Sequence, residues 1–169
     1  MYAGYDMPAA DAKSVRELRF EIEEFHVEYC NTLDRGALED WPAFFTEDAV
    51  YRVTARENAD AGLPVGLVYA DSKAMIRDRA FAIKHTQMFA PRYMQHFVTN
   101  VRVISAALGA IKAQSNYLLL QTLVDGPTTI HQSGRYFDTF VRDGGRLLLK
   151  ERQCVYDTLL IANDLVYPV

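Results

Sequence analysis

Residues 111–142, IKAQSNYLLLQTLVDGPTTIHQSGRYFDTFVR, combine two long strand-forming runs with a tight turn between them. The runs 111–124 and 128–142 are rich in β-branched, aromatic and leucine residues, and Asp125-Gly126-Pro127 is a turn signal. The pattern predicts an antiparallel β-hairpin. Similar runs flank it at 95–106 and 146–159, set off by Leu108-Gly109 and Asp143-Gly144-Gly145. Four consecutive antiparallel strands are therefore expected in the second half of the chain.

The first half of the chain is mainly helical in pattern. Ser14 followed by Glu17 resembles a capping box, and apolar residues then recur every three or four positions to Leu33, which predicts an amphipathic helix. A second helix is expected over 71–86, capped by Asp71 or Ser72. Between these helices, the sequence favours a short helix at 37–45, a strand at 49–55, a polar loop at 56–62 and a hairpin partner strand at 63–70.

This order of elements predicts an α+β fold in which the early helices cover the concave face of a curved antiparallel sheet. With 169 residues the chain fits one domain, 1–169, with an N-terminal segment of about 13 residues expected to be flexible. The segment 115–124 carries apolar residues on both faces of its strand. One face can be covered by the helices. The other is covered either by the chain itself or by a partner subunit.

Composition excludes several functional classes. The net charge is -4 and no basic stripe is present, so nucleic acid is not an expected partner. No apolar run approaches the ~20 residues that span a bilayer, and residues 1–12 lack the features of a signal peptide, so a cytoplasmic protein without a membrane partner is expected. Cys30 and Cys154 are far apart in apolar segments, and we expect two buried free thiols.

No motif in the sequence indicates a metal centre or a catalytic site. The four histidines are scattered, and paired cysteine and histidine motifs for a Rieske cluster are missing. An alternative remains open, because polar side chains in an apolar cavity can perform acid-base chemistry. Its candidates are a carboxylate base, a histidine proton carrier and a tyrosine donor: Asp34, Asp48, His85, His96 and Tyr51.

Several segments together resemble the β subunits of bacterial aromatic-ring-hydroxylating dioxygenases. They are WPAFFTEDAVYRV (41–53), RENADAGLP (56–64), DSKAMIRDR (71–79), RYMQHFVTNVRV (92–103) and SGRYFDTFVRDGGRLLLKERQCVYDT (133–158). The resemblance covers nearly the whole chain after about residue 16. RENADAGLP and the closing NDLVYPV are most similar to the branch that acts with enzymes for aromatic acids such as salicylate, terephthalate, anthranilate or benzoate.

The resemblance implies a cone-shaped fold like that of nuclear transport factor, ketosteroid isomerase and scytalone dehydratase. It implies a non-catalytic structural subunit, with no cofactor of its own and no catalytic residue. The partner would be a catalytic α subunit that holds a Rieske [2Fe-2S] cluster and a mononuclear Fe(II). An α3β3 assembly containing a β3 core is expected, which receives electrons from NADH through a reductase or ferredoxin.

Within such an assembly the β subunit would present an apolar and arginine-rich surface. Arginine binds carboxylates through two hydrogen bonds and stacks on aromatic rings. The candidates for subunit contacts are Arg77, Arg79, Arg92 and Arg102. Two other functions stay open: a stand-alone isomerase, dehydratase or cyclase of the same fold, and a ligand-binding or interaction module without chemistry.

Overall fold

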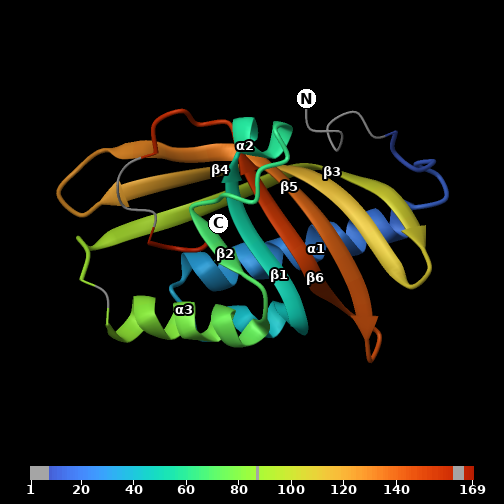
Figure 1. Ribbon diagram of the computed structural model, residues 1–169, viewed down its shortest axis with the longest axis horizontal. Helices are drawn as coiled ribbons and strands as arrows, with labels where there is room; N and C mark the ends of the chain where they lie inside the picture. The colour runs from blue at the N-terminus through green and yellow to red at the C-terminus, as the bar shows by residue number, and fades with distance from the viewer. Residues whose placement is uncertain (1–7, 87, 162–165) are drawn as a thin grey trace.

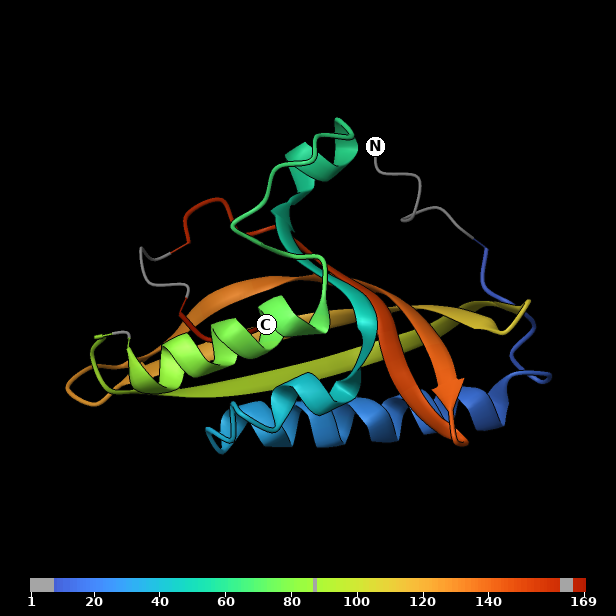
Figure 2. The same cartoon turned by 60° about the horizontal axis from the view of Figure 1, so that its bottom comes forward.

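A computed structural model describes residues 8–86, 88–161 and 166–169. In chain order the elements are α1 (Arg16–Asp34), the 3-10 helix η2 (Trp41–Phe44), β1 (Phe45–Ala55), α2 (Arg56–Asp60), β2 (Val68–Ala70), α3 (Lys73–His85), β3 (Arg92–Ala107), β4 (Ala110–Leu123), β5 (Thr128–Asp143) and β6 (Arg146–Tyr156). The strands form one curled sheet, and α1 and α3 lie against its concave side (Figure 1; Figure 2). The expected α+β architecture is confirmed.

The sheet has the strand order β2-β1-β6-β5-β4-β3. β3 to β6 form the expected antiparallel succession, and β1 pairs with β2 in an antiparallel hairpin. The expectation of a wholly antiparallel sheet is wrong at one junction, because β1 and β6 run parallel. After β2 the chain passes through α3 to the opposite edge of the sheet, where β3 begins. Strands β3 to β6 then follow one another back across the sheet, and β6 ends beside β1 and runs in the same direction. Alternation within one strand carries no information about this long-range pairing.

The core lies between the two helices and the concave face of the sheet. Ile22, Tyr29 and Leu33 of α1 are almost fully buried, as are Tyr51 of β1 and Phe140 of β5. Their positions follow the helical repeat of α1 and the alternation of the strands, so one face of each element is removed from water. Burial of each such side chain contributes on the order of 1.5–3 kcal/mol to folding.

The two long helices begin differently. Ser72 caps α3, since its side chain accepts a hydrogen bond from the Met75 N–H at 3.4 Å. The capping box expected at Ser14 is wrong: α1 begins at Arg16, and no side chain caps it. The Ser14 N–H instead donates to the Asp11 carboxylate at 3.0 Å, which uses Ser14 in the turn before the helix.

Boundaries between residues 37 and 70 differ most from the expectation. Only Trp41–Phe44 is helical in the expected helix at 37–45, and β1 begins at Phe45, because Pro42 is tolerated only in a first helical turn. The expected loop 56–62 contains the short helix α2, and the expected strand 63–70 is reduced to Val68–Ala70. The last strand ends at Tyr156 rather than at residue 159.

The start of the described chain is tied to the sheet edge. The Ala10 N–H donates to the Val103 carbonyl of β3 at 2.9 Å. Residues 1–7 of the N-terminal segment expected to be flexible lie outside the described residues, as does Leu165 of the closing segment.

Candidate functional site

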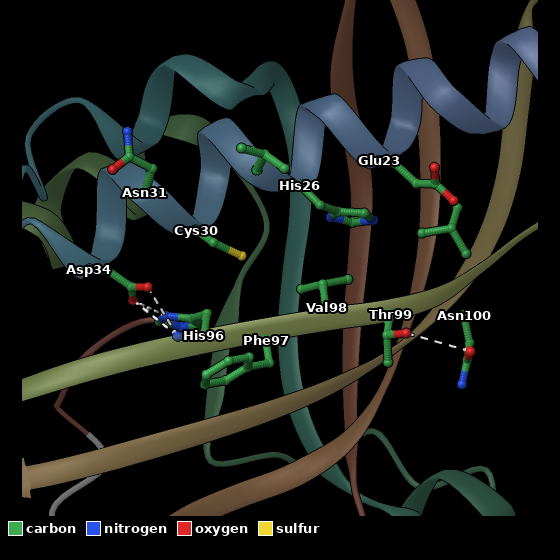
Figure 3. A pocket seen from close by; sticks show the side chains of 12 residues that line it. Glu23, His26, Cys30, Asn31, Asp34, His96, Phe97, Val98, Thr99 and Asn100 are labelled. Carbon is green, nitrogen blue, oxygen red and sulfur yellow. Dashed lines mark hydrogen bonds and ion pairs between the residues drawn. The ribbon is translucent and has the colours of Figure 1, made fainter.

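A hollow of about 610 Å³ lies between α1 and β3, an edge strand of the sheet (Figure 3). One face of α1 lines it, and residues 96–101 of β3 line the opposite wall. Val27 and Phe97 are 57% and 46% exposed, so the rim is open to solvent and partly apolar. His26, Cys30 and His96 are buried in its inner wall. The hollow is therefore a groove along a sheet edge whose polar groups lie at its inner side.

An Asp-His pair closes one end of this groove. His96 Nδ1 is 2.6 Å from Asp34 Oδ1, and the His96 backbone N–H donates to both carboxylate oxygens of Asp34 at 3.1–3.2 Å (Figure 3). His96 Nε2 is 3.2 Å from the Pro168 carbonyl oxygen. Both ring nitrogens thus face oxygen atoms of the chain's own residues, so neither is directed toward a substrate.

The closing segment 166–169 occupies the space between the helices and the sheet. Val169 is fully buried; its N–H donates to the Tyr51 hydroxyl at 2.9 Å, and its carbonyl accepts from Tyr29 at 3.2 Å and Tyr51 at 3.3 Å. The Val166 carbonyl accepts from the Arg79 guanidinium at 3.0 Å. The described part of this apolar segment packs against its own domain. It fills the interior of the fold with the chain's own backbone.

A charged pair lies at the centre of the core. Arg152 of β6 donates to both Asp138 oxygens of β5 at 2.9 and 2.8 Å, and its guanidinium lies 4.2 Å from the ring centroids of both Tyr29 and Tyr136. Burial lowers the pKa of Arg152, but the Asp138 carboxylate together with Tyr29 and Tyr136 more than offsets it and holds the pKa well above its usual value. The side chain is therefore a fixed cation enclosed by two aromatic rings.

His26 lies beside this pair and is held in its neutral form. Its Nδ1 accepts from Arg152 Nη2 at 3.2 Å. Burial, and secondly the Arg152 charge, lower the pKa of His26 well below its usual value. Sequence reasoning missed the pair formed by Asp138 and Arg152. The available signal is that both occupy inward-facing strand positions, next to Tyr136 and Cys154, where an unpaired charge would be costly.

The five acid-base candidates do not form one cluster. Asp34 and His96 are hydrogen-bonded, and Tyr51 contacts the same closing segment. Asp48 lies at the surface, where hydrogen bonds from Lys150 at 2.8 Å and Thr46 at 2.9 Å lower its pKa. His85 is a surface residue 3.2 Å from Glu39. The structure therefore brings together Asp34, His96 and Tyr51 and leaves Asp48 and His85 apart.

The four interface candidates also differ. Arg79 binds the closing segment, and Arg92 donates to the Ala90 carbonyl at 3.0 Å and the Gln121 side chain at 3.1 Å. Arg77 lies at the surface, 3.4 Å from Glu47. Arg102 is exposed on β3, at a polar hollow of the sheet's outer face. Arg79 and Arg92 thus have structural contacts within the chain, and Arg102 points outward.

The outer face of β3, β4 and β5 carries a row of apolar side chains. Phe97 pairs with Leu118 across β3 and β4, and Leu120 pairs with Ile130 across β4 and β5. Ile130 is 66% exposed, and Leu118 and Leu120 are partly buried. The chain's own helices cover the opposite face. We call Phe97, Leu118, Leu120 and Ile130 the outer apolar row; four adjoining apolar side chains of this kind are typical of a contact surface.

The described part of the chain contains no cluster of three or more histidine, cysteine or acidic side chains that could bind a metal ion. Cys30 and Cys154 are buried free thiols, as expected. Burial raises the pKa of Cys30 to about 12, so this thiol stays protonated. Within the same described residues, no helix has the length and apolarity needed to cross a membrane.

Comparison with known proteins agrees with the resemblance in the sequence. The family model for the ring hydroxylating beta subunit matches residues 29–163. The small subunit of anthranilate 1,2-dioxygenase from Burkholderia cepacia is 35% identical over 150 residues, covering 89% of this chain and 93% of that protein. The crystal structure of a β subunit assigned to an aromatic-ring-hydroxylating dioxygenase of Novosphingobium aromaticivorans is 36% identical, with a TM-score of 0.84, over 92% of this chain and 99% of that one.

A more distant structure extends the comparison to the fold. A protein of Novosphingobium aromaticivorans assigned as a scytalone dehydratase has a TM-score of 0.68 at 21% identity, over 90% of this chain and 95% of that one. At this identity the likeness concerns the fold alone. The fold expected from the sequence, shared with scytalone dehydratase, is confirmed.

Proposed function

The chain belongs to the family of β subunits of ring-hydroxylating dioxygenases, and we propose that it is the non-catalytic structural subunit that assembles with and stabilises the catalytic α subunit. The observation that carries this proposal is the filled interior. Segment 166–169 occupies the space between helices and sheet, with its backbone bound by Tyr29, Tyr51 and His96. A core completed in this way suits a rigid support better than a substrate chamber.

The outer apolar row supports the same proposal. Phe97 and Ile130 are exposed large side chains on a sheet face that none of the helices in the described residues covers. Burial of such side chains against another subunit releases water and stabilises an assembly. We infer that this face is a principal contact of the complex.

In the proposed complex the iron chemistry belongs to the α subunit. That subunit would hold the Rieske cluster and the mononuclear iron, in an α3β3 assembly with a β3 core in the cytoplasm. Electrons would come from NADH through a reductase or ferredoxin. The substrate would be an aromatic acid, because the relative from Burkholderia cepacia is named for anthranilate.

Co-expression with the large subunit of the same oxygenase tests the proposal. We expect a stable mixed complex on size-exclusion chromatography with light scattering, all the iron in the large subunit, and aggregation or iron loss of that subunit when it is produced alone. A β chain that elutes alone, and a large subunit that keeps its iron and activity without it, would contradict the support function.

A second candidate function rests on the hydrogen bond between Asp34 and His96. In this alternative the pair performs acid-base chemistry as an isomerase, dehydratase or cyclase, and segment 166–169 must first leave the interior, because the Pro168 carbonyl occupies His96 Nε2. Binding of aromatic ligands by the isolated chain, followed by NMR of His96, tests it. Ligand-induced release of segment 166–169 favours the alternative. An unchanged segment in the presence of ligands favours the support function.

A further inference from the structure

A second hollow on the outer face of the sheet adjoins the outer apolar row. It has a volume of about 420 Å³ and is lined by residues of β3, β4 and β5: Asn100, Val101, Arg102, Gln114, Asn116 and Arg135. We call it the bulge pocket. Asn116 of β4 pairs with Arg135 of β5. The next pair on the same face of these two strands is Leu118 with Ser133. The pocket and the apolar row therefore form one continuous surface.

A β-bulge in β3 shapes this pocket. The register between β3 and β4 shifts between Thr99 and Arg102, and Asn100 adopts a positive φ of 57°. A bulge inserts extra residues on one strand and redirects the neighbouring side chains. Here it places Arg102 directly opposite Gln114. Asparagine is one of the few residues besides glycine that adopt this left-handed backbone readily, so Asn100 suits the bulge.

The floor of the pocket contains a buried polar group. Gln114 is only 4% exposed, and its Oε1 has no hydrogen-bond partner within the described residues. Leaving such a group unpaired costs about 1–3 kcal/mol. A carboxamide can present its oxygen or, after half a turn, its NH2 group, so Gln114 can bind a partner that enters the pocket.

The charges of the pocket are of one sign. Arg102 and Arg135 contribute guanidinium groups, and no aspartate or glutamate belongs to the lining. Neither β3 nor β4 contains an acidic residue anywhere along its length. The Arg102 guanidinium beside the Gln114 carboxamide matches a carboxylate, which accepts several N–H donors and binds arginine through two hydrogen bonds; Arg135 adds positive charge at the same place.

We propose that the bulge pocket binds the carboxylate of an aspartate or glutamate side chain of the α subunit. This inference rests on the proposed function. Three exposed acids of this chain, Glu21, Glu47 and Asp48, already pair with basic groups of their own chain, so they are weaker occupants from a second copy. The like charges around the pocket also oppose its contact with the same pocket of another copy. Flanked by the outer apolar row, the ion pair would be sheltered from water and would set the orientation of the subunits.

The test uses complexes co-expressed with the large subunit and a dilution series followed by mass photometry, at about 50 and 500 mM salt. The variants Arg102→Gln and Arg102→Gln/Arg135→Gln remove the proposed donors. Lys112→Gln is the matched control, because it removes the same charge from the same face outside the pocket. Arg102→Lys keeps the charge but not the two-pronged geometry.

We expect the dissociation constant of the complex to rise about tenfold or more in the double variant at low salt, with Arg102→Lys intermediate and Lys112→Gln unchanged. The difference should shrink only slightly at high salt, because an ion pair sheltered from water is screened less than an exposed one. Equal affinity of the double variant and wild type would overturn the proposal while leaving the support function intact. Failure of the wild type to form a complex would instead refute the support function. A loss confined to self-association of the isolated chain would identify a second copy as the occupant and also overturn the proposal.

Discussion

The interior between helices and sheet and the outer face of β3–β5 are built in opposite ways. In the interior, segment 166–169 binds Tyr29, Tyr51 and His96, and Arg152 is paired with Asp138. On the outer face, Phe97 and Ile130 are exposed beside a pocket whose charges are all positive. The difference teaches that one chain completes the interior by itself, whereas the outer face leaves apolar side chains and like charges exposed, as the proposed assembly requires. Stability and assembly should therefore respond to different substitutions.

The largest effect on stability is expected from Asp138→Ala. The change leaves the Arg152 cation buried between Tyr29 and Tyr136 without a counter-charge, and we expect the free energy of unfolding to fall by about 3–5 kcal/mol. Urea denaturation measures it. Asp48→Ala, which removes an exposed carboxylate bonded to Lys150, is the control and should change stability little. Equal losses in the two variants would mean that the buried pair has no special importance.

Tyr51→Phe tests the filled interior directly. The hydroxyl that is lost accepts from the Val169 N–H and donates to the Val169 carbonyl, both of which are buried. Unfolding should become easier by about 1–3 kcal/mol, and hydrogen exchange at Val169 should accelerate. Tyr69→Phe, at a 49% exposed tyrosine of β2, provides the comparison. Unaltered exchange at Val169 would show that the segment is held by other contacts.

The pH dependence of stability should reveal the neutral state of His26. Because its folded pKa is lowered, the unfolded chain takes up a proton below about pH 6.5 that the folded chain does not. Stability is thus retained above this pH and declines as the pH falls, by up to about 1.4 kcal/mol per pH unit. His26→Gln should flatten the curve between about pH 7 and 5.5. Parallel curves for wild type and His26→Gln would argue against a neutral buried His26.

The smallest effect on stability, and the largest on assembly, is expected from Phe97→Ser and Ile130→Ser. Both side chains are exposed, so unfolding should change by no more than about 0.5 kcal/mol. The affinity for the large subunit should fall about tenfold or more, because the apolar centre of a contact surface dominates its binding energy. Phe20→Ser, at a 62% exposed residue of α1, serves as control. If Phe20→Ser weakens the complex and Phe97→Ser does not, the contact lies elsewhere.

Local patterns in the sequence predicted most elements but not all of their ends. α3 and its Ser72 cap were predicted because the cap and the apolar stripe are local signals. The capping box at Ser14 failed because Asp11 competes for the Ser14 N–H in the preceding turn. The strand expected at 63–70 shortened to Val68–Ala70, since a pairing partner, rather than composition, sets the length of an edge strand.

The candidate site was only partly foreseen. Asp34, His96 and Tyr51 were chosen for their chemistry, and the fold brings them to the same closing segment. Asp48 and His85 were chosen on the same grounds and lie at the surface. Residue type alone could not separate the two groups, because the side on which a side chain emerges depends on where its element docks.

The sequence by itself determined the family, the α+β class and the succession of four antiparallel strands, because periodicity, turn residues and family motifs are properties of neighbouring positions. Tertiary structure alone decided that β1 runs parallel to β6, that Arg152 meets Asp138, and that segment 166–169 closes the interior. Each of these contacts joins two strands, or two segments far apart in the sequence. The groups come within reach of one another only after the sheet has curled. The free energy of burying all these groups together selects that geometry, and no single stretch of residues contains it.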